Sequence, residues 1–172
     1  GGATAVLEDF AHVVKMRISS GAAGGSVSPD GVLAVRSGFP TFMAQHVWLT
    51  QGQWYYELEI LAAVGGCPQV GWADAAFKGG NSAQGEGVGD DIHSWGADGA
   101  RVSKWWRGSQ AFGSAWKAGD VLGCALDLDA KTVSFSLNGS FAAPWGLAFT
   151  GIEVGGVAMT PALTFNTGVQ FR

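Results

Sequence analysis

Apolar and polar residues alternate with a period of two over much of the chain. In residues 54–60, glutamates occupy two of the intervening positions, and the apolar positions are Trp54, Tyr56, Leu58 and Ile60. This alternation is typical of a β-strand that has one face in a hydrophobic core. It predicts that these four apolar side chains point inward.

The same test predicts strands at residues 14–18 and 133–137. Short apolar runs bounded by Gly, Asp, Asn or Pro predict further strands, at residues 69–73, 121–128, 157–165 and 169–171. Tight turns are predicted at residues 127–132 and at Asn138-Gly139, a residue pair that tolerates positive φ. Helical periodicity does not persist over a dozen residues in any part of the sequence.

Many short antiparallel strands must stack or close to bury their apolar faces. We therefore predict an all-β fold, a two-sheet antiparallel β-sandwich, with residues 1–172 in a single domain. A length of 172 residues is sufficient for one hydrophobic core without disulfides. Residues 19–30 are rich in Gly, Ala and Ser and are predicted to form an exposed loop.

Composition narrows the classes of function. The net charge is -4 and lysines and arginines are scattered singly, so the basic stripe that nucleic-acid binding requires is missing. No apolar run reaches about 18 residues, and we expect no direct membrane insertion. Cys67 and Cys124 lie in no metal-binding or redox motif, which favours reduced thiols and an intracellular, cytoplasmic location.

No nucleophile, base and orienting acid occur at a catalytic spacing, so we expect no enzyme activity, no cofactor and no metal. Asp90, Asp91 and Asp98 have two interpretations. They could supply oxygen ligands for calcium, although the EF-hand spacing is absent, or they could accept backbone N–H bonds and order a loop. We favour the second interpretation, and we likewise read Asp127 and Asp129 as turn residues.

The eight tryptophans divide into two groups. Four are flanked by Gly and apolar residues and are predicted to be core: Trp54, Trp72, Trp95 and Trp116. The other four are candidates for exposure: Trp48, Trp105, Trp106 and Trp145. Trp105 and Trp106 would point to opposite faces of a strand, so we expect at least one to be exposed. An exposed Trp106 beside Arg107 would be a binding hot spot, and the alternative is that Trp106 packs under a loop.

Several motifs occur together in a fixed order. They are Gly52-Gln53-Trp54-Tyr55-Tyr56-Glu57, Val70-Gly71-Trp72-Ala73, Gly89-Asp90-Asp91 with Trp95 and Asp98-Gly99, Lys104-Trp105, the run 116–128, Ser134-Phe135-Ser136-Leu137-Asn138-Gly139 and Pro161-Ala162-Leu163. In these motifs the chain resembles the SPRY domain family, and it is most similar to the SPRY domains of ryanodine receptors. The match is clearest over residues 52–172.

The resemblance implies a bent, concanavalin-like sandwich that binds proteins without catalysis or a cofactor. It also implies binding loops at one edge of the sandwich, which correspond to residues 36–42, the region of Gln84, and residues 166–168. With the Trp106 hot spot added, the predicted partner-binding residues are Arg36, Phe39, Phe42, Gln84, Trp106, Arg107, Asn166 and Thr167. Phe39 and Phe42 are included because an apolar pair in a loop needs a covering surface.

We therefore predict a non-enzymatic module of a larger intracellular protein that binds a protein or peptide segment through its edge loops. Two alternatives stay open. One is a structural packing domain in a large, ryanodine-receptor-like channel assembly. The other is carbohydrate recognition by a lectin-like face, which would require exposed, coplanar tryptophans surrounded by Asn, Asp and Gln.

Overall fold

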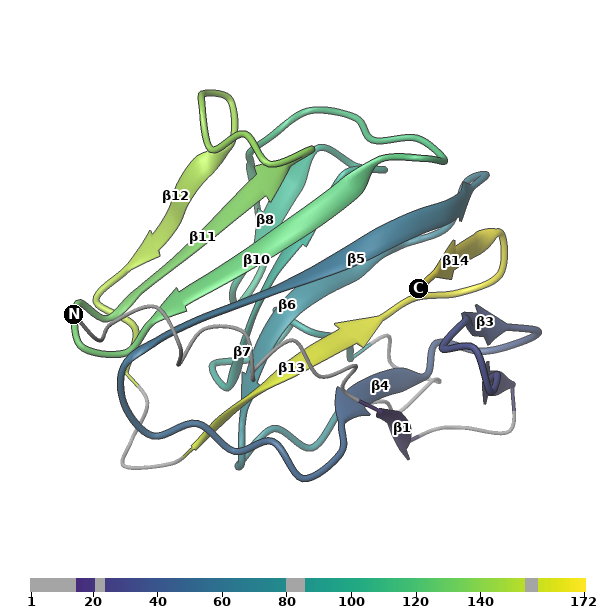
Figure 1. Cartoon of the computed structure of the whole chain (residues 1–172), viewed down its shortest axis with the longest axis horizontal. Coiled ribbons are helices and arrows are strands. Elements are labelled where there is room, and N and C mark those ends of the chain that lie inside the picture. Colours follow the sequence, from purple (N-terminus) through teal and green to yellow (C-terminus); the bar gives the residue numbers. More distant parts are fainter. Residues whose placement is uncertain (1–14, 21–23, 80–85, 154–157) are drawn as a thin grey trace, which may run out of the picture.

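The chain folds as two stacked antiparallel sheets. The computed structural model describes residues 15–20, 24–79, 86–153 and 158–172. Figure 1 shows strands β12, β11, β10 and β5 in one layer, with β8, β7 and β6 in the layer behind. In the described residues no helix is long and apolar enough to cross a membrane. The predicted all-β sandwich is confirmed.

The first sheet has seven strands. In spatial order they are β1 (Met16–Ser20), β4 (Thr41–Ala44), β13 (Met159–Thr164), β6 (Gln69–Asp74), β7 (Ser94–Asp98), β8 (Ser103–Trp105) and β9 (Ser109–Ala111). The second sheet also has seven strands, in the order β12 (Gly146–Thr150), β11 (Thr132–Leu137), β10 (Val121–Asp127), β5 (Gln53–Ala63), β14 (Val169–Phe171), β3 (Leu33–Val35) and β2 (Gly25–Val27). The strands predicted from the sequence all appear, with ends that differ by a few residues.

Both predicted turns are present. Asn138 and Gly139 adopt φ angles of 51° and 78°, and the Ser140 N–H donates to the Leu137 carbonyl oxygen at 3.0 Å. At the turn between β10 and β11, the Asp127 carboxylate accepts the N–H groups of the two residues that follow Leu128. The sequence therefore predicts these connections correctly because the turn chemistry is local.

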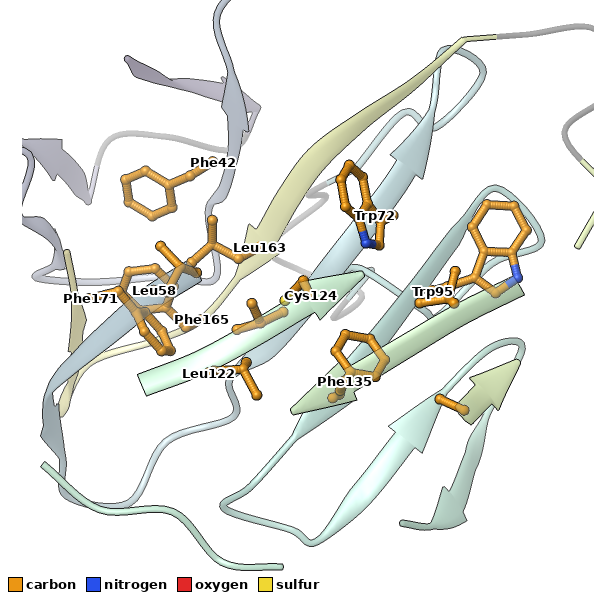
Figure 2. Close-up of a cluster of buried hydrophobic side chains, with 14 of the residues drawn as sticks. Phe42, Leu58, Trp72, Trp95, Leu122, Cys124, Phe135, Leu163, Phe165 and Phe171 are labelled. Atoms are coloured by element: carbon orange, nitrogen blue, oxygen red, sulfur yellow. The ribbon is translucent and has the colours of Figure 1, made fainter. Parts of the chain in front are cut away.

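Side chains that point between the sheets form the main core, which Figure 2 shows. Leu58 and Ile60 of β5 are buried, as are Val133 and Phe135 of β11. These are the residues that the alternation predicts to face inward. The period-two pattern thus identifies the core face of each of these strands.

Tyr56 joins the two sheets directly. The Tyr56 hydroxyl of β5 donates to the Gly71 carbonyl oxygen of β6 at 2.6 Å. The Tyr56 ring meets the Trp72 ring edge-on, with their centroids 5.0 Å apart. A Cβ atom at Gly71 would lie 2.0 Å from the carbonyl oxygen of Trp95 on the adjacent strand, so this position excludes every side chain.

Phe42 belongs to this main core. It is fully buried, and its ring stacks on Phe165 at a centroid distance of 5.0 Å. The prediction that Phe42 contacts a partner is therefore wrong. Residue 42 lies inside β4 and not in a loop, and alternation along that strand turns Phe42 toward the main core and Met43 toward the opposite face.

A second, smaller hydrophobic cluster lies apart from the main core. It consists of Met43, Ala73, Phe77, Val88 and Ala162. Met43, Ala73 and Ala162 come from β4, β6 and β13, whereas Phe77 and Val88 come from the connection between β6 and β7. Phe77 and Val88 therefore pack on the outer face of the first sheet.

The structure corrects the prediction of an exposed loop over residues 19–30. Strand β2 lies inside this range and pairs with β3 through Gly25↔Val35 and Val27↔Leu33. A Gly-rich, Ser-rich composition favours loops, but pairing with a buried neighbouring strand prevails here. Residues 21–23 lie outside the described part of the chain.

Two tryptophan predictions are also wrong. Trp54 is 39% exposed because it is the second residue of β5, beyond the reach of the core, and its indole N–H donates to the Gln51 carbonyl oxygen. Trp145 is only 8% exposed, since it stacks on Trp116 at 6.5 Å and donates to the Ser114 hydroxyl at 2.9 Å. The other predicted core tryptophans, Trp72, Trp95 and Trp116, are buried, and Trp48 and Trp106 are exposed.

We expect Phe42→Ala to lower the free energy of unfolding by about 3–5 kcal/mol, because it leaves a cavity beneath Phe165. Leu147→Ala is the control, since Leu147 is 59% exposed and should change stability by less than about 0.5 kcal/mol. Denaturant unfolding measures both values. Equal, small effects would show that Phe42 is not a core residue.

Candidate functional site

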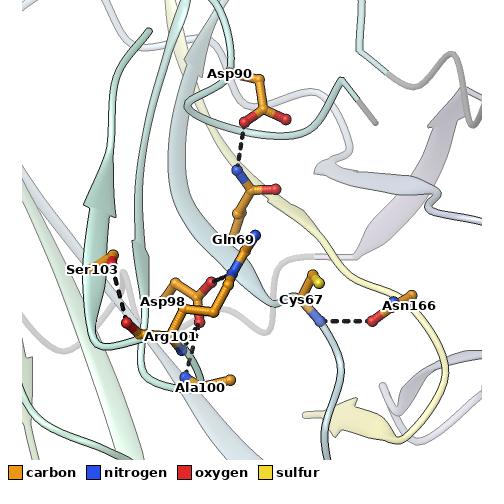
Figure 3. Close-up of polar contacts among 8 residues, drawn as sticks. All are labelled: Cys67, Gln69, Asp90, Asp98, Ala100, Arg101, Ser103 and Asn166. Atoms are coloured by element: carbon orange, nitrogen blue, oxygen red, sulfur yellow. Dashed lines mark hydrogen bonds and ion pairs between the residues drawn. The ribbon is translucent and has the colours of Figure 1, made fainter. Parts of the chain in front are cut away.

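Several connections meet at one end of the sandwich and form what we call the rim. The rim comprises Arg36 and Phe39 between β3 and β4, Cys67 between β5 and β6, Asp90 before β7, Arg101 after β7, and Asn166 and Thr167 between β13 and β14. Figure 3 shows Cys67, Gln69, Asp90, Arg101 and Asn166 in one region of the molecule. Loops that are far apart in the sequence therefore share one surface.

The loop after β13 is tied to the loop after β5. The side-chain oxygen of Asn166 accepts the Cys67 N–H at 2.7 Å. A Cβ atom at Gly66 would lie 2.9 Å from the same Asn166 oxygen, so the two loops approach closely only because residue 66 is glycine. Asn166 thereby holds the rim together, while its neighbour Thr167 is exposed to solvent.

A buried glutamine supports the next part of the rim. Gln69 is only 1% exposed, and its amide donates to the Asp90 carboxylate at 2.8 Å. The other Asp90 oxygen accepts the Gly87 N–H at 2.6 Å. A Cβ atom at Gly87 would lie 2.6 Å from the Phe39 ring, so Phe39 packs directly on this ordered turn. Phe39 is half-buried and Arg36 is exposed.

Arg101 closes the rim on the side of β7. The buried Asp98 carboxylate accepts the N–H groups of Ala100 and Arg101 at 2.8 and 2.9 Å, and it pairs with the Arg101 guanidinium. The guanidinium also lies 4.2 Å from the centre of the Trp105 ring. These contacts hold a partly exposed cation in one orientation.

The predicted partner-binding residues do not form one cluster. Arg36, Phe39, Asn166 and Thr167 lie at the rim, whereas Phe42 is in the core. Trp106 and Arg107 lie in the turn between β8 and β9, three strands from β13. Three inter-strand steps correspond to about 14 Å. The predicted residue Gln84 lies outside the described part of the chain.

Trp106 and Arg107 form a separate exposed pair. Trp106 is 44% exposed, and the Arg107 guanidinium carbon lies 5.7 Å from the centre of its ring. The expectation that one of the two adjacent tryptophans is exposed is confirmed, since Trp105 is half-buried under Arg101. Whether the pair contacts a partner stays a prediction.

Gln69 and Arg101 are rim residues that are not predicted from the sequence, whereas Asp98 has the loop-ordering role that the sequence favours. One signal was available for Gln69, because a glutamine that begins an apolar strand has to satisfy its amide by a specific bond. For Arg101 the signal was the Asp-Gly-Ala-Arg order, which places a cation three residues after a turn-forming aspartate. Neither signal reveals the Trp105 ring beneath the guanidinium, because that contact is tertiary.

The carboxylates act mainly as acceptors for backbone N–H groups, which is the interpretation favoured from the sequence. Asp91 accepts the His93 N–H at 2.9 Å and the Ser94 hydroxyl at 2.7 Å, and Asp90, Asp98 and Asp127 behave similarly. In the described ranges no group of three or more His, Cys, Asp or Glu side chains is arranged to hold a metal ion.

Together these observations define a two-sheet β-sandwich whose connecting loops form an ordered rim at one end. A family model of the SPRY domain matches residues 53–172, and the chain belongs to the SPRY domain family. SPRY domains are protein-interaction modules and not catalytic domains.

One relative is similar in sequence and one solved structure is similar in fold. The chain is 38% identical over 165 residues to E3 ubiquitin-protein ligase RKP of Arabidopsis thaliana, an alignment that covers 94% of this chain and 12% of that protein. The chain thus spans only a small part of this relative. The crystal structure of the SPRY domain of human HERC1 superimposes with a TM-score of 0.69 and 21% identity, over 86% of this chain and 90% of that chain. This similarity shows a shared fold. The narrower resemblance to ryanodine receptors is not among these findings.

We expect Asp98→Ala to lower the free energy of unfolding by about 2–3 kcal/mol, because two backbone N–H groups and a guanidinium lose a buried acceptor. Asp129→Ala, at an exposed turn, should cost no more than about 0.5 kcal/mol. Thermal unfolding of both variants measures the difference. An Asp98 variant as stable as the control would mean that this carboxylate does not order the rim.

The two free cysteines should react very differently with iodoacetamide. Burial raises the pKa of the Cys124 thiol to about 12, so the reactive thiolate is scarce in the folded protein at mildly alkaline pH. Cys67 is half-buried at the rim and should be alkylated first. Peptide mapping should find Cys124 modified only after unfolding, and equal labelling in the folded state would contradict the burial of Cys124.

Proposed function

We propose that the chain is the recognition module of a larger intracellular protein and that it binds a segment of a partner protein through the rim. The module itself performs no chemistry. Its rigid sandwich holds the rim loops in place before a partner arrives, which lowers the conformational entropy that binding must overcome.

The observation that carries this proposal is the contrast between the two layers of the rim. The supporting layer is polar and hydrogen-bonded, through Cys67–Asn166 and Gln69–Asp90. The layer above it leaves Arg36, Phe39 and Thr167 accessible to solvent. A partly exposed aromatic ring, a cation and a hydroxyl on a fixed base are the groups that interface hot spots use.

The similarity to an E3 ubiquitin-protein ligase suggests a setting for this module. In this proposal the domain selects a binding partner, while the catalytic steps take place elsewhere in the larger protein. We propose this role for the chain, with a location inside the cell. The Trp106–Arg107 pair is a second contact in this proposal, separate from the rim.

The experiment compares two double variants of the 172-residue chain. Arg36→Ala with Thr167→Ala removes exposed groups from the rim, and Trp106→Ala with Arg107→Ala removes the separate pair. Proteins retained from a lysate by the unaltered chain are identified by mass spectrometry, and the affinity for each purified protein is then measured by calorimetry. We expect the rim variant to weaken binding at least about tenfold, with the melting temperature changed by less than about 2 °C.

The matched control is Thr50→Ala with Lys131→Ala. Both residues are exposed, and neither lies at the rim, because Thr50 follows the bridge Leu49↔Met159 at the opposite end of β13. This variant should bind like the unaltered chain. A partner lost only from the Trp106–Arg107 variant would move the binding surface to that pair, and equal binding by all variants would contradict the proposal.

A further inference from the structure

The outer face of the second sheet carries a row of side chains that crosses four strands. The pairings Tyr55↔Ala125, Ala125↔Ser134 and Ser134↔Leu147 run from β5 through β10 and β11 to β12. Tyr55 is 49% exposed and Leu147 is 59% exposed. Two large apolar side chains therefore stand on either side of two small residues, and this face is turned toward the viewer in Figure 1.

The small residues continue along the two central strands. The next row pairs Gly123 of β10 with Ser136 of β11. A Cβ atom at Gly123 would lie 2.2 Å from the Tyr55 hydroxyl oxygen, so the tyrosine ring leans over this end of the row. A hollow of about 360 Å³ lies on the other side of the ring, and its lining includes Ala125, Asp127 and Ser134.

Acidic groups mark both ends of this surface. Asp127 lies across from Gln53 at one end, and Glu57 lies across from Gly123 at the other. The N–H of Ala130 and the Gln53 amide lower the pKa of the Asp127 carboxyl, which keeps it negatively charged at neutral pH. On this face Arg172 is already paired with Glu59. The surface between Asp127 and Glu57 therefore has an excess of negative charge.

The spacing of the acidic groups matches an extended peptide. Asp127 and Gly123, which lies beside Glu57, are four residues apart on β10, or about 13 Å. In an extended segment every second side chain points to the same side, so residues i, i+2 and i+4 would face the sheet together over the same length. The middle one of these three would lie above Ala125 and Ser134.

From this geometry we propose that the groove between Tyr55 and Leu147 binds an extended partner segment of the pattern basic–x–apolar–x–basic. Its apolar side chain lies on Ala125 and Ser134 beside the Tyr55 ring, and one basic side chain pairs with Asp127. The Tyr55 hydroxyl donates to the Glu57 carboxylate at 2.9 Å, and the second basic side chain passes over this hydroxyl to pair with the same carboxylate. This surface uses none of the rim residues, so the chain would hold two segments at once, either of one partner or of two.

A neutral sugar fits this surface less well. A sugar-binding face would require exposed aromatic rings that are coplanar. The rings of Tyr55 and Phe141 are not coplanar, because they are inclined at 50° to each other. The carboxylates of Asp127 and Glu57 also favour a cationic ligand, because a sugar hydroxyl that bonds to them carries no positive charge to balance theirs. A sugar is therefore the competing outcome of the test.

The probe is a fluorescein-labelled peptide with the sequence Thr-Arg-Ser-Leu-Ser-Arg-Thr. Its control is the scrambled peptide Thr-Arg-Arg-Ser-Ser-Leu-Thr, which has the same composition and charge but the wrong spacing. Fluorescence anisotropy with the 172-residue chain should show saturable binding of the probe, at least about tenfold tighter than the scrambled peptide. Added salt should weaken it, because the ion pairs are exposed.

Two variants test the location. Ser134→Arg places a bulky cation on the floor of the groove, and Leu147→Ser removes one wall without touching the core. Each should weaken binding of the probe at least about tenfold, whereas Trp106→Ser, on the other sheet, should not change it. Leu147→Ser keeps the test decisive if the Ser134 variant does not fold.

The proposal is overturned by any of four results. These are no saturation below about 1 mM peptide, equal affinity for the scrambled peptide, unchanged affinity in both groove variants, or binding of cello- or chito-oligosaccharides in place of the peptide, read from the tryptophan and tyrosine fluorescence. Loss of peptide binding in the groove variants with partner binding at the rim intact would separate this proposal from the proposed function.

Discussion

The close approach of Tyr56 to the Gly71–Trp72 backbone is the constraint on which the rest of the structure depends. The hydroxyl reaches from the second sheet to a carbonyl oxygen of the first, and the ring packs edge-on against Trp72. This contact sets the separation of the sheets at this point. Within the first sheet, a side chain at Gly71 is excluded by the adjacent strand, because its Cβ atom would lie 2.0 Å from the Trp95 carbonyl oxygen. Because Gln69 lies two residues before Gly71 on the same strand, the contact also sets the position of the rim.

The loops of the rim are held in place by residues on or next to the strands beneath them. Asn166 and Gln69 are each within two residues of a paired strand, and both use their side chains to bind a neighbouring loop. These bonds are partly buried, which reduces competition from water and favours one conformation of each loop. The accessible groups above them therefore need little ordering when they meet another molecule, which is the physical basis for expecting recognition here and not chemistry.

Much of the fold could be predicted from the sequence, because strand alternation and turn chemistry are local. Leu58, Ile60 and Phe135 face inward as alternation requires. Alternation gives the side of a strand but not the extent of the core, so it predicts that Trp54 is inside. Trp145 lies just before β12, and its stacking on Trp116 is a tertiary contact that no local pattern contains. Phe42 is wrongly predicted to lie in a binding loop. The run Gly-Phe-Pro-Thr-Phe is compatible both with a loop and with a short strand near the edge of a sheet, so the sequence alone does not distinguish them. The bond between Gln69 and Asp90 is also a tertiary contact that no local pattern contains, whereas the bonds from Ala100 and Arg101 to Asp98 are local and follow from the order Asp-Gly-Ala-Arg.

The cluster of Met43, Ala73, Phe77, Val88 and Ala162 has a consequence for how this protein can change over evolution. The first sheet separates this cluster from the main core. The described part of the connection between β6 and β7 is held by this cluster and by hydrogen bonds such as that of the Val88 N–H to the Thr164 hydroxyl. Substitutions in that connection then disturb a few small contacts while the sandwich keeps its full aromatic packing. New binding preferences can therefore arise at the rim while the folded state stays stable, so one fold can bind many unrelated partners.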